Sequence, residues 1–262
     1  MAACSRVQGN RPHACGLPTQ EALSTDPHYY SMISIADNIR NVRQRIAEAE
    51  KSAGRSANSV QLLAVSKTRT AEEIGRAYQC GLTRFGENYL QEALEKIEAL
   101  HALPLEWHFI GPLQSNKTRQ VAEHFDWIHT VDRLKIAQRL SAQRPEEKAP
   151  LNLCIQVNIS EEDSKSGVAL EEVADLASQI ISLPRLRLRG LMCIPAADLT
   201  PEALAVCYQR MQAEFQRLKD RHNTLDTLSM GMSDDLAAAI AGGATLVRIG
   251  TALFGPRPPK TL

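Results

Sequence analysis

The chain has 262 residues, of which 44% are hydrophobic and 23% charged, and this suits one large globular domain or two small ones. Its 30 basic and 30 acidic residues cancel, so no net charge attracts nucleic acid or an anionic membrane. No apolar run reaches the roughly 18 residues that a transmembrane helix needs, and the six cysteines form no CxxC pair. We therefore expect a protein with reduced cysteines, located in the cytoplasm, without a nucleic-acid or membrane partner.

The first 31 residues differ in character from the rest of the chain. They mix Pro, Gly, His and small polar residues without periodicity, and they lack the apolar core of a secretory signal. We interpret residues 1–31 as a disordered extension or leader, with Met32 as a candidate native start. Residues 32–262 are then expected to form a single domain.

From Ile35 onward, apolar runs of strand length alternate with segments of helical periodicity. The first helix is predicted from Ile35 and ends before Gly54, and the first strand follows at 61–67. Thr70 and Glu73 have the spacing of a capping box, which predicts that a helix begins directly after this strand. The remaining strands are predicted at 84–88, 107–110, 127–131, 151–157, 186–192, 225–230 and 246–249. The helices after strands one to seven are predicted at 70–80, 90–100, 115–125, 134–140 (capped by Asp132), 170–183, 201–219 and 234–241.

The alternation of strands and helices indicates the fold class. Eight strands, the first seven each followed by a helix, imply a parallel sheet in an α/β protein. Eight such units that close on themselves form a (β/α)8 TIM barrel. An open doubly wound sheet is the main alternative, but it usually carries a G-x-G-x-x-G turn after its first strand, where this chain has Ser66 and Lys67. We therefore predict the barrel.

Lys67 stands at the carboxyl end of the first predicted strand. Barrels of this kind carry their chemistry at that end of the strands. An amine that is partly desolvated there loses proton affinity and can attack a carbonyl carbon. A solvated loop lysine is the alternative, and it is the better interpretation when Lys67 is considered alone.

The loops after strands seven and eight are the usual phosphate-binding segments of this fold. Here they run from Ser229 to Ser233 and from Arg248 to Thr251, and their glycines and hydroxyls suit an anion. Structural roles remain open for Ser233 as a helix N-cap, for Gly250 as a turn residue, and for Arg248 as a buried ion-pair partner. An amine opposite a phosphate site suits an aldehyde that carries a phosphate. Pyridoxal 5'-phosphate meets this description, and Arg248 is placed to donate to its ring nitrogen.

Seven short motifs carry a more specific signal. They are AVSK (64–67), FGENY (85–89), WHFIG (107–111) with QxNK (114–117), SKSG (164–167), GLM (190–192), SMGMSD (229–234) and RIGT (248–251). In this order, over about residues 35–255, they resemble the YggS/PROSC family of pyridoxal phosphate homeostasis proteins. The resemblance implies a barrel like the N-terminal domain of alanine racemase, without the racemases' C-terminal β-domain.

The same resemblance implies the roles of individual residues. Lys67 matches the lysine that holds pyridoxal 5'-phosphate as a Schiff base, Asn88 a residue near the phenolic oxygen, and Arg248 the partner of the ring nitrogen. The residues that match the phosphate site are Ser229, Met230, Gly231, Ser233, Gly250 and Thr251.

Two classes of function are compatible with this site: a small amino acid racemase or decarboxylase, and a carrier that buffers the cofactor and delivers it to apoenzymes. Racemisation needs a base on each face of the substrate carbon, and Tyr89 and His108 are more typical of packing residues. An arginine at the ring nitrogen weakens the cofactor as an electron sink. Only about a dozen residues follow strand eight, too few for the racemases' C-terminal β-domain. We therefore predict a monomeric carrier without dedicated catalysis, and the family resemblance implies that it controls vitamin B6 pools. Lys165 is a weaker candidate for accepting the cofactor during transfer, against a solvated loop lysine.

Overall fold

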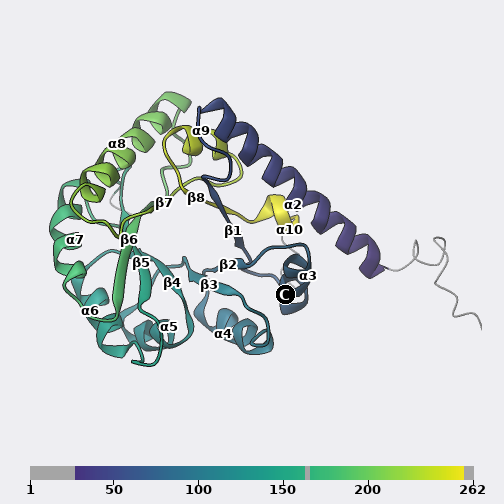
Figure 1. The fold of residues 1–262 in the computed structure, drawn as a ribbon, viewed down its shortest axis with the longest axis horizontal. Helices are drawn as coiled ribbons and strands as arrows, with labels where there is room; N and C mark the ends of the chain where they lie inside the picture. Colours follow the sequence, from purple (N-terminus) through teal and green to yellow (C-terminus); the bar gives the residue numbers. More distant parts are fainter. Residues whose placement is uncertain (1–26, 163–165, 257–262) are drawn as a thin grey trace, which may run out of the picture. The chain divides into compact units, whose positions relative to one another are not determined.

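The computed structural model describes residues 27–162 and 166–256, with side chains from Ile35 onward. The chain divides into two units, 1–34 and 35–262, and the barrel belongs to the second. Eight parallel strands close into a barrel in sequence order, and helices surround it (Figure 1). This arrangement confirms the predicted (β/α)8 barrel and excludes the open doubly wound sheet.

The bounds of the elements follow the predicted alternation closely. The strands are β1 (Gln61–Val65), β2 (Arg84–Glu87), β3 (Glu106–Phe109), β4 (Trp127–Val131), β5 (Leu151–Val157), β6 (Leu186–Cys193), β7 (Thr227–Ser229) and β8 (Leu246–Ile249). The helices are α2 (Pro27–Ser52), α3 (Ala71–Gln79), α4 (Leu90–Ala99), α5 (Thr118–His124), α6 (Leu134–Gln143), α7 (Val173–Ile181), α8 (Pro201–Lys219), α9 (Leu236–Ala241) and α10 (Thr251–Phe254). Short 3-10 turns, η1 (Ser115–Lys117) and η2 (Leu170–Glu172), precede α5 and α7.

Local sequence explains where several helices begin. The capping box at α3 forms as predicted: the Glu73 N–H donates to Thr70 Oγ1 over 3.2 Å, and the Thr70 N–H donates to Glu73 Oε2 over 2.8 Å. Helix α8 begins with Pro201 after the capping side chain of Thr200, because proline at the first helical position sacrifices only an N–H that would lack a helical partner.

Other helix termini differ from the predictions. Helix α2 begins at Pro27, before the predicted start at Ile35, and residues 1–26 of the expected extension lie outside the described residues. Asp132 does not cap α6, because Arg133 occupies the N-cap and the Asp132 carboxylate accepts from its side chain. Helix α10 was not predicted, since four residues are too few to show a period.

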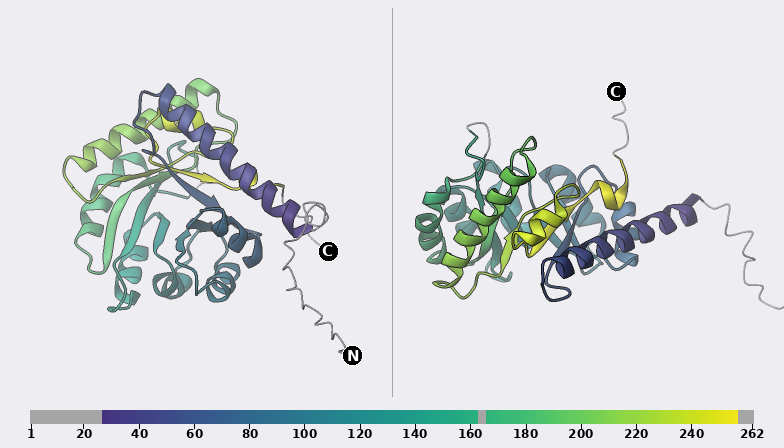
Figure 2. Two further views of the ribbon diagram at one scale, coloured as in Figure 1. Left: turned by 45° about the vertical axis from the view of Figure 1, so that its right-hand side comes forward. Right: turned by 90° about the horizontal axis from the view of Figure 1, so that it is seen from above.

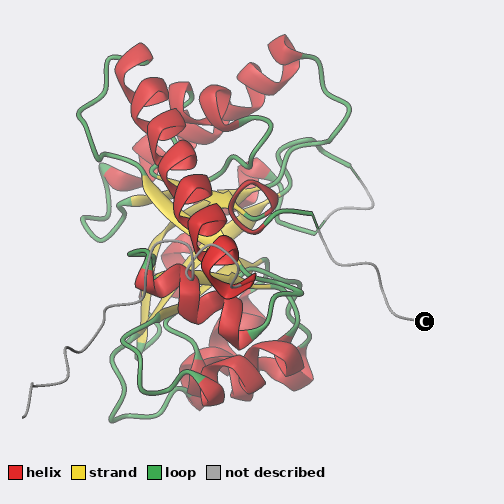
Figure 3. Ribbon diagram, turned by 90° about the vertical axis from the view of Figure 1, so that its right-hand side faces the viewer, coloured by secondary structure: helices red, strands yellow, loops and turns green. Residues whose placement is uncertain are grey.

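The apolar core lies mainly between the strands and the surrounding helices. One large cluster joins residues of all eight strands to the inward faces of the helices. Figure 3 shows the strands enclosed by helices, and Figure 2 shows α8 and α9 outside the strands. Two smaller clusters are separate from this layer, one of Leu63, Ile110 and Leu246 and one of Trp127, Cys154 and Met192. Among the described residues, no helix is long and apolar enough to cross a membrane.

Strand register determines which residues meet at the carboxyl mouth of the barrel. Strand β1 closes the barrel against β8, with Leu63 opposite Arg248 and Ala64 opposite Ile249. Parallel strands present their carboxyl ends at the same edge. The residues that follow β1 and β8, which include Lys67 and Gly250, therefore share one mouth.

Candidate functional site

A cavity of about 780 Å³ opens at the carboxyl ends of the strands. Six of the nine predicted cofactor-binding residues line it: Lys67, Asn88, Ser233, Arg248, Gly250 and Thr251. The other lining residues are Arg45, Val65, Ile110, Ile194, Met232, Asp234 and Ala252. The fold therefore brings an amine, an amide and a guanidinium together with the two predicted phosphate-binding loops.

The backbone on both sides of Lys67 is fixed by side chains of neighbouring units. Before it, the buried Ser66 donates its hydroxyl to Glu87 Oε1 over 2.6 Å. After it, Thr68 adopts a left-handed conformation with φ of 65°, and its N–H donates to Glu92 Oε1 over 2.6 Å. Lys67 thus lies on a short turn with both flanks anchored to β2 and α4.

A second lysine lies beneath this turn but does not line the cavity. Lys96 Nζ donates to the Ser66 carbonyl and to Glu87 Oε1, each over 2.8 Å, and it also pairs with Glu92. Burial raises the pKa of Glu87 above its ordinary value, although the charge of Lys96 opposes this shift. Lys96 therefore supports the strand ends that carry Lys67.

Arg248 points from β8 into the barrel mouth and is only 5% exposed. Its guanidinium donates to Ser229 Oγ over 2.8 Å and to the Cys193 carbonyl over 2.9 Å. None of the ion pairs among the described residues includes Arg248, and burial lowers its pKa from the usual high value. The arrangement does not match the alternative role of ion-pair partner, and it leaves other N–H groups for the cavity.

Three predicted residues, Ser229, Met230 and Gly231, do not line the cavity but shape the loop that leads to it. The Met230 N–H donates to the Leu246 carbonyl over 3.1 Å, and the Gly231 carbonyl accepts from the Arg248 N–H over 3.0 Å. Gly231 has φ of 93°, and a Cβ there would lie 2.4 Å from Ala239 Cβ, so no other residue fits.

The predicted phosphate-binding side of the cavity is rich in donors. Ser233 and Thr251 contribute hydroxyls, and the first N–H groups of α10 have no partner within the helix. Ser233 is not a helix N-cap, because Asp235 holds that position in α9. Arg45 of α2 also lines this side and donates to the Ser233 carbonyl over 2.6 Å. Sequence reasoning missed Arg45, because it lies 22 residues before Lys67 on a polar helix face and carries no local motif.

An unpaired polar atom indicates that the cavity suits a ligand. Asn88 Oδ1 is buried and has no hydrogen-bond partner within the part of the chain that the structure describes, which is costly unless a ligand group satisfies the side chain. The cavity lining thus combines an amide, an amine, a guanidinium and two hydroxyls. This set of groups fits the phenolic oxygen, the aldehyde, the ring nitrogen and the phosphate of pyridoxal 5'-phosphate.

The remaining candidates fall into different environments. Tyr89 is 56% exposed at the start of α4. His108 is fully buried and bonds to Glu106 and His129, in agreement with the packing role that was favoured for it. Lys165 lies outside the described residues. Sequence reasoning overlooked His129, although a histidine two residues after Trp127 in an apolar strand marks the same face of β4.

Comparison with known proteins agrees with this geometry. Residues 32–258 match the family described as alanine racemase, N-terminal domain. The chain is 58% identical over 226 residues to a pyridoxal phosphate homeostasis protein of Pseudomonas aeruginosa, which covers 86% of this chain and 97% of the relative. It is 55% identical over 229 residues to the protein of the same name from Escherichia coli K12, with 86% and 98% covered.

Solved structures give the same fold. PipY of Synechococcus elongatus, in a structure with pyridoxal phosphate bound, is 37% identical and superposes with a TM-score of 0.73, covering 84% of this chain and all of that one. Alanine racemase of Corynebacterium glutamicum is 17% identical with a TM-score of 0.60, and the match covers 88% of this chain and 62% of the racemase. At that identity the likeness shows the barrel fold alone.

Proposed function

Because the chain belongs to the alanine racemase N-terminal domain family and, within it, to the pyridoxal phosphate homeostasis proteins, we propose that it binds pyridoxal 5'-phosphate at the carboxyl mouth of its barrel and buffers the intracellular supply. The observation that carries this proposal is the convergence of Lys67, Asn88, Arg248 and the two donor-rich loops on one cavity. The cofactor supplies an aldehyde and a phosphate, and each has a complementary group there.

The proposed attachment is covalent. The neutral amine of Lys67 condenses with the aldehyde, so a carbon–nitrogen double bond forms and the carbonyl oxygen leaves as water. The anchored turn around Lys67 supports this role, because Ser66 and Thr68 restrict where the amine can lie. Arg248 donates to the ring nitrogen, Asn88 to the phenolic oxygen, and Ser233, Gly250 and Thr251 hold the phosphate, with Ser229, Met230 and Gly231 shaping that loop.

The test is to trap the linkage chemically. Purified protein is loaded with pyridoxal phosphate, reduced with borohydride and digested, and the modified peptide is identified by mass spectrometry. We expect modification of Lys67 and its loss in Lys67→Ala. Lys148→Ala is the control, because the Lys148 side chain is exposed, donates to the Glu123 carbonyl and does not line the cavity. Modification that persists elsewhere at full yield in Lys67→Ala would refute the proposal.

We also propose that the protein carries the cofactor without dedicated catalysis. Arg248 supports this, because a guanidinium donates a hydrogen bond and leaves the ring nitrogen unprotonated, which weakens the cofactor as an electron sink. His108 is enclosed in the barrel and Tyr89 faces solvent, so neither is placed as a second acid/base group. Turnover of any amino acid faster than about 1 s⁻¹ by the loaded protein would favour the racemase or decarboxylase alternative.

The proposal extends to delivery of the cofactor to apoenzymes by a cytoplasmic monomer. The four described cysteines are all free, which suits a reducing compartment. Mixing loaded protein with an apoenzyme should restore the activity of that enzyme. The rate of restoration should exceed the rate at which the cofactor dissociates from the loaded protein, as measured with a scavenger. Equal rates would restrict the function to buffering, and sedimentation would test the monomeric state.

A further inference from the structure

A column of polar side chains runs through the interior of the barrel below Arg248. The Arg248 guanidinium donates to Ser229 Oγ over 2.8 Å, and Ser229 Oγ lies 2.9 Å from His129 Nδ1. Ser229 ends β7 and His129 lies in β4, and these strands are not neighbours in the barrel. Their contact therefore crosses the interior from one wall to the other.

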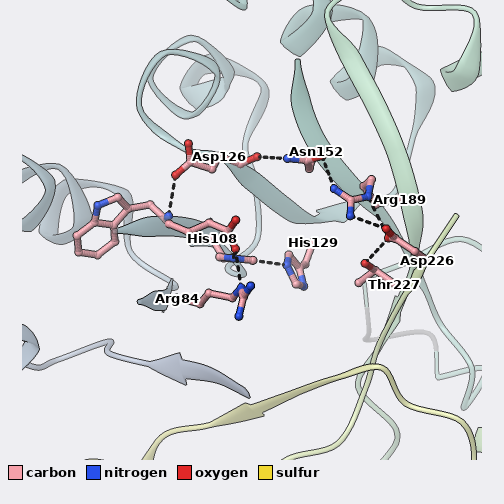
Figure 4. A network of polar contacts seen from close by, with 10 residues as sticks. Arg84, His108, Asp126, His129, Asn152, Arg189, Asp226 and Thr227 are labelled. Carbon is pink, nitrogen blue, oxygen red and sulfur yellow. Dashed lines mark hydrogen bonds and ion pairs between the residues drawn. The ribbon is translucent and has the colours of Figure 1, made fainter. Parts of the chain in front are cut away.

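The column continues to the opposite mouth of the barrel. His129 Nε2 lies 2.9 Å from His108 Nδ1 (Figure 4). On the other side of its ring, His108 Nε2 lies 2.8 Å from Glu106 Oε1. Glu106 is the first residue of β3 and is 38% exposed, and Arg84, the first residue of β2, donates to the same carboxylate oxygen over 3.0 Å. Four hydrogen bonds thus connect the amino-terminal mouth to the guanidinium at the cofactor cavity.

The two ends of the column determine its direction. A guanidinium can only donate and an ionised carboxylate can only accept. Arg248 therefore donates to Ser229, the Ser229 hydroxyl to His129 Nδ1, and His129 Nε2–H to His108 Nδ1. The last bond runs from His108 Nε2–H to Glu106. Every member is satisfied when both imidazoles are neutral and carry their proton on Nε2.

Burial and charge favour that neutral form. Both imidazoles are fully buried, and burial lowers the pKa of each, with the neighbouring imidazole and Arg248 lowering that of His129 further. The charged groups that face His108 are Glu106, Arg84 and Asp126, and only the two carboxylates oppose the shift. Partial burial alone would raise the pKa of Glu106, but donation from His108 and Arg84 holds it below its ordinary value.

We propose that this column is a positioning device: Glu106, His108, His129 and Ser229 hold the Arg248 guanidinium in the plane and donor direction that meet the ring nitrogen of the bound cofactor. The proposal rests on the proposed function. A proton added to His129 would turn Nδ1 into a donor toward Ser229 and place a second positive charge beside Arg248. Burial, the neighbouring imidazole and the charge of Arg248 disfavour that proton, while the carboxylate at the far mouth orients the two neutral rings, so it acts on the cofactor without touching it.

The first test uses the protein without cofactor, so it does not depend on the proposed function. Nitrogen-15 NMR of the imidazoles at neutral pH should show His108 and His129 both protonated on Nε2 and unprotonated on Nδ1. A proton on Nδ1 of either ring, or a charged ring, would contradict the inferred direction of the hydrogen bonds and overturn the proposal. The spectrum of Glu106→Gln should show a mixture of tautomers, because a carboxamide can donate as well as accept.

The second test measures action through Arg248. We expect Glu106→Gln to bind pyridoxal phosphate about fivefold more weakly than the wild type, in the range of ordinary coupling between sites. An analogue with carbon in place of the ring nitrogen should bind both proteins equally, since it offers Arg248 no hydrogen-bond acceptor. Glu106→Asp, which keeps the carboxylate, should restore much of the loss. The matched control is Asp226→Asn, because Asp226 pairs with Arg189 just before β7 and is outside the column.

The outcomes separate the two proposals. If the wild type does not bind pyridoxal phosphate, the proposed function fails. The NMR result still shows whether the hydrogen bonds of the column run in the inferred direction. If Glu106→Gln binds the cofactor as the wild type does, or if it loses the same factor for the analogue, the positioning role is overturned. A fivefold loss in Asp226→Asn as well would also overturn it, since any lost ion pair would then suffice. If Glu106→Gln does not fold, the tautomers of His108 and His129 in the wild type decide whether the column has the inferred direction.

Discussion

At the scale of single residues, the turn that carries Lys67 stores conformational strain. Thr68 has φ of 65°, a left-handed conformation that β-branched residues strongly disfavour. Its side chain is exposed, so no burial compensates, and two bonds hold the conformation: its own N–H donates to Glu92, and the Arg69 N–H donates to the Ser66 carbonyl. Strain of this kind is found where the surrounding structure over-determines a functional segment.

Replacing Thr68 with asparagine should therefore stabilise the protein. Asparagine tolerates the left-handed region, so Thr68→Asn should raise the free energy of unfolding by about 1 kcal/mol. Urea unfolding measures the change. Thr83→Asn, at an exposed loop position without a left-handed conformation, should stay within about 0.5 kcal/mol of the wild type. A destabilised Thr68→Asn would show that the threonine side chain has a role of its own.

At the scale of elements, α4 secures the ends of β1 and β2 through one buried cation. Lys96 connects the Ser66 carbonyl at the end of β1 with Glu87 of β2 and with Glu92 of its own helix. Glu87 is fully buried, and its second oxygen has no partner among the described residues. Removing the cation would leave an uncompensated carboxylate in the interior.

Lys96→Met should accordingly destabilise the protein by about 3–5 kcal/mol, the usual cost of breaking a buried ion pair. Adding Glu87→Gln should recover a large part of that loss, because no charge then remains unpaired. Thermal and urea unfolding of both single variants and the double variant give the coupling energy. A loss below about 1 kcal/mol in Lys96→Met, or additive losses, would contradict a paired role for these two side chains.

At the scale of the whole molecule, the barrel interior is partly polar and the main apolar layer lies outside the strands. His108 and His129 occupy space that aliphatic side chains fill in many barrels of this fold. Because both rings have pKa values below the ordinary 6.5, the unfolded chain binds more protons than the folded one when the pH falls below that value. The two histidines thus tie the stability of the whole barrel to pH.

The free energy of unfolding should fall as the pH drops below about 6.5, by at most about 1.4 kcal/mol per pH unit for each imidazole. Glu87, whose pKa is raised by burial, acts in the opposite direction above its ordinary 4.5. Unfolding curves between about pH 5.5 and 7.5 measure the net slope. His129→Gln should have a shallower slope than the wild type, and an identical slope would show that His129 is not buried in its neutral form.

The sequence alone determined the alternation of elements, because strand and helix periodicity and the capping box of Thr70 and Glu73 involve residues close together in the chain. It therefore predicted eight strands, the barrel, and the placement of Lys67, Arg248 and the two last loops at one mouth. It did not determine whether Ser233 caps a helix, since the start of α9 at Leu236 depends on packing.

Only the tertiary structure decided which residues meet across the barrel. His129 and Ser229 are 100 positions apart, and Arg45 and Ser233 are 188 apart. No local pattern encodes such a contact, because it exists only once strand register and closure bring opposite walls within hydrogen-bond distance. The residues at the mouth of the site could be predicted from the order of strands and loops along the chain. The column that supports Arg248 could not, because it forms only when the barrel closes.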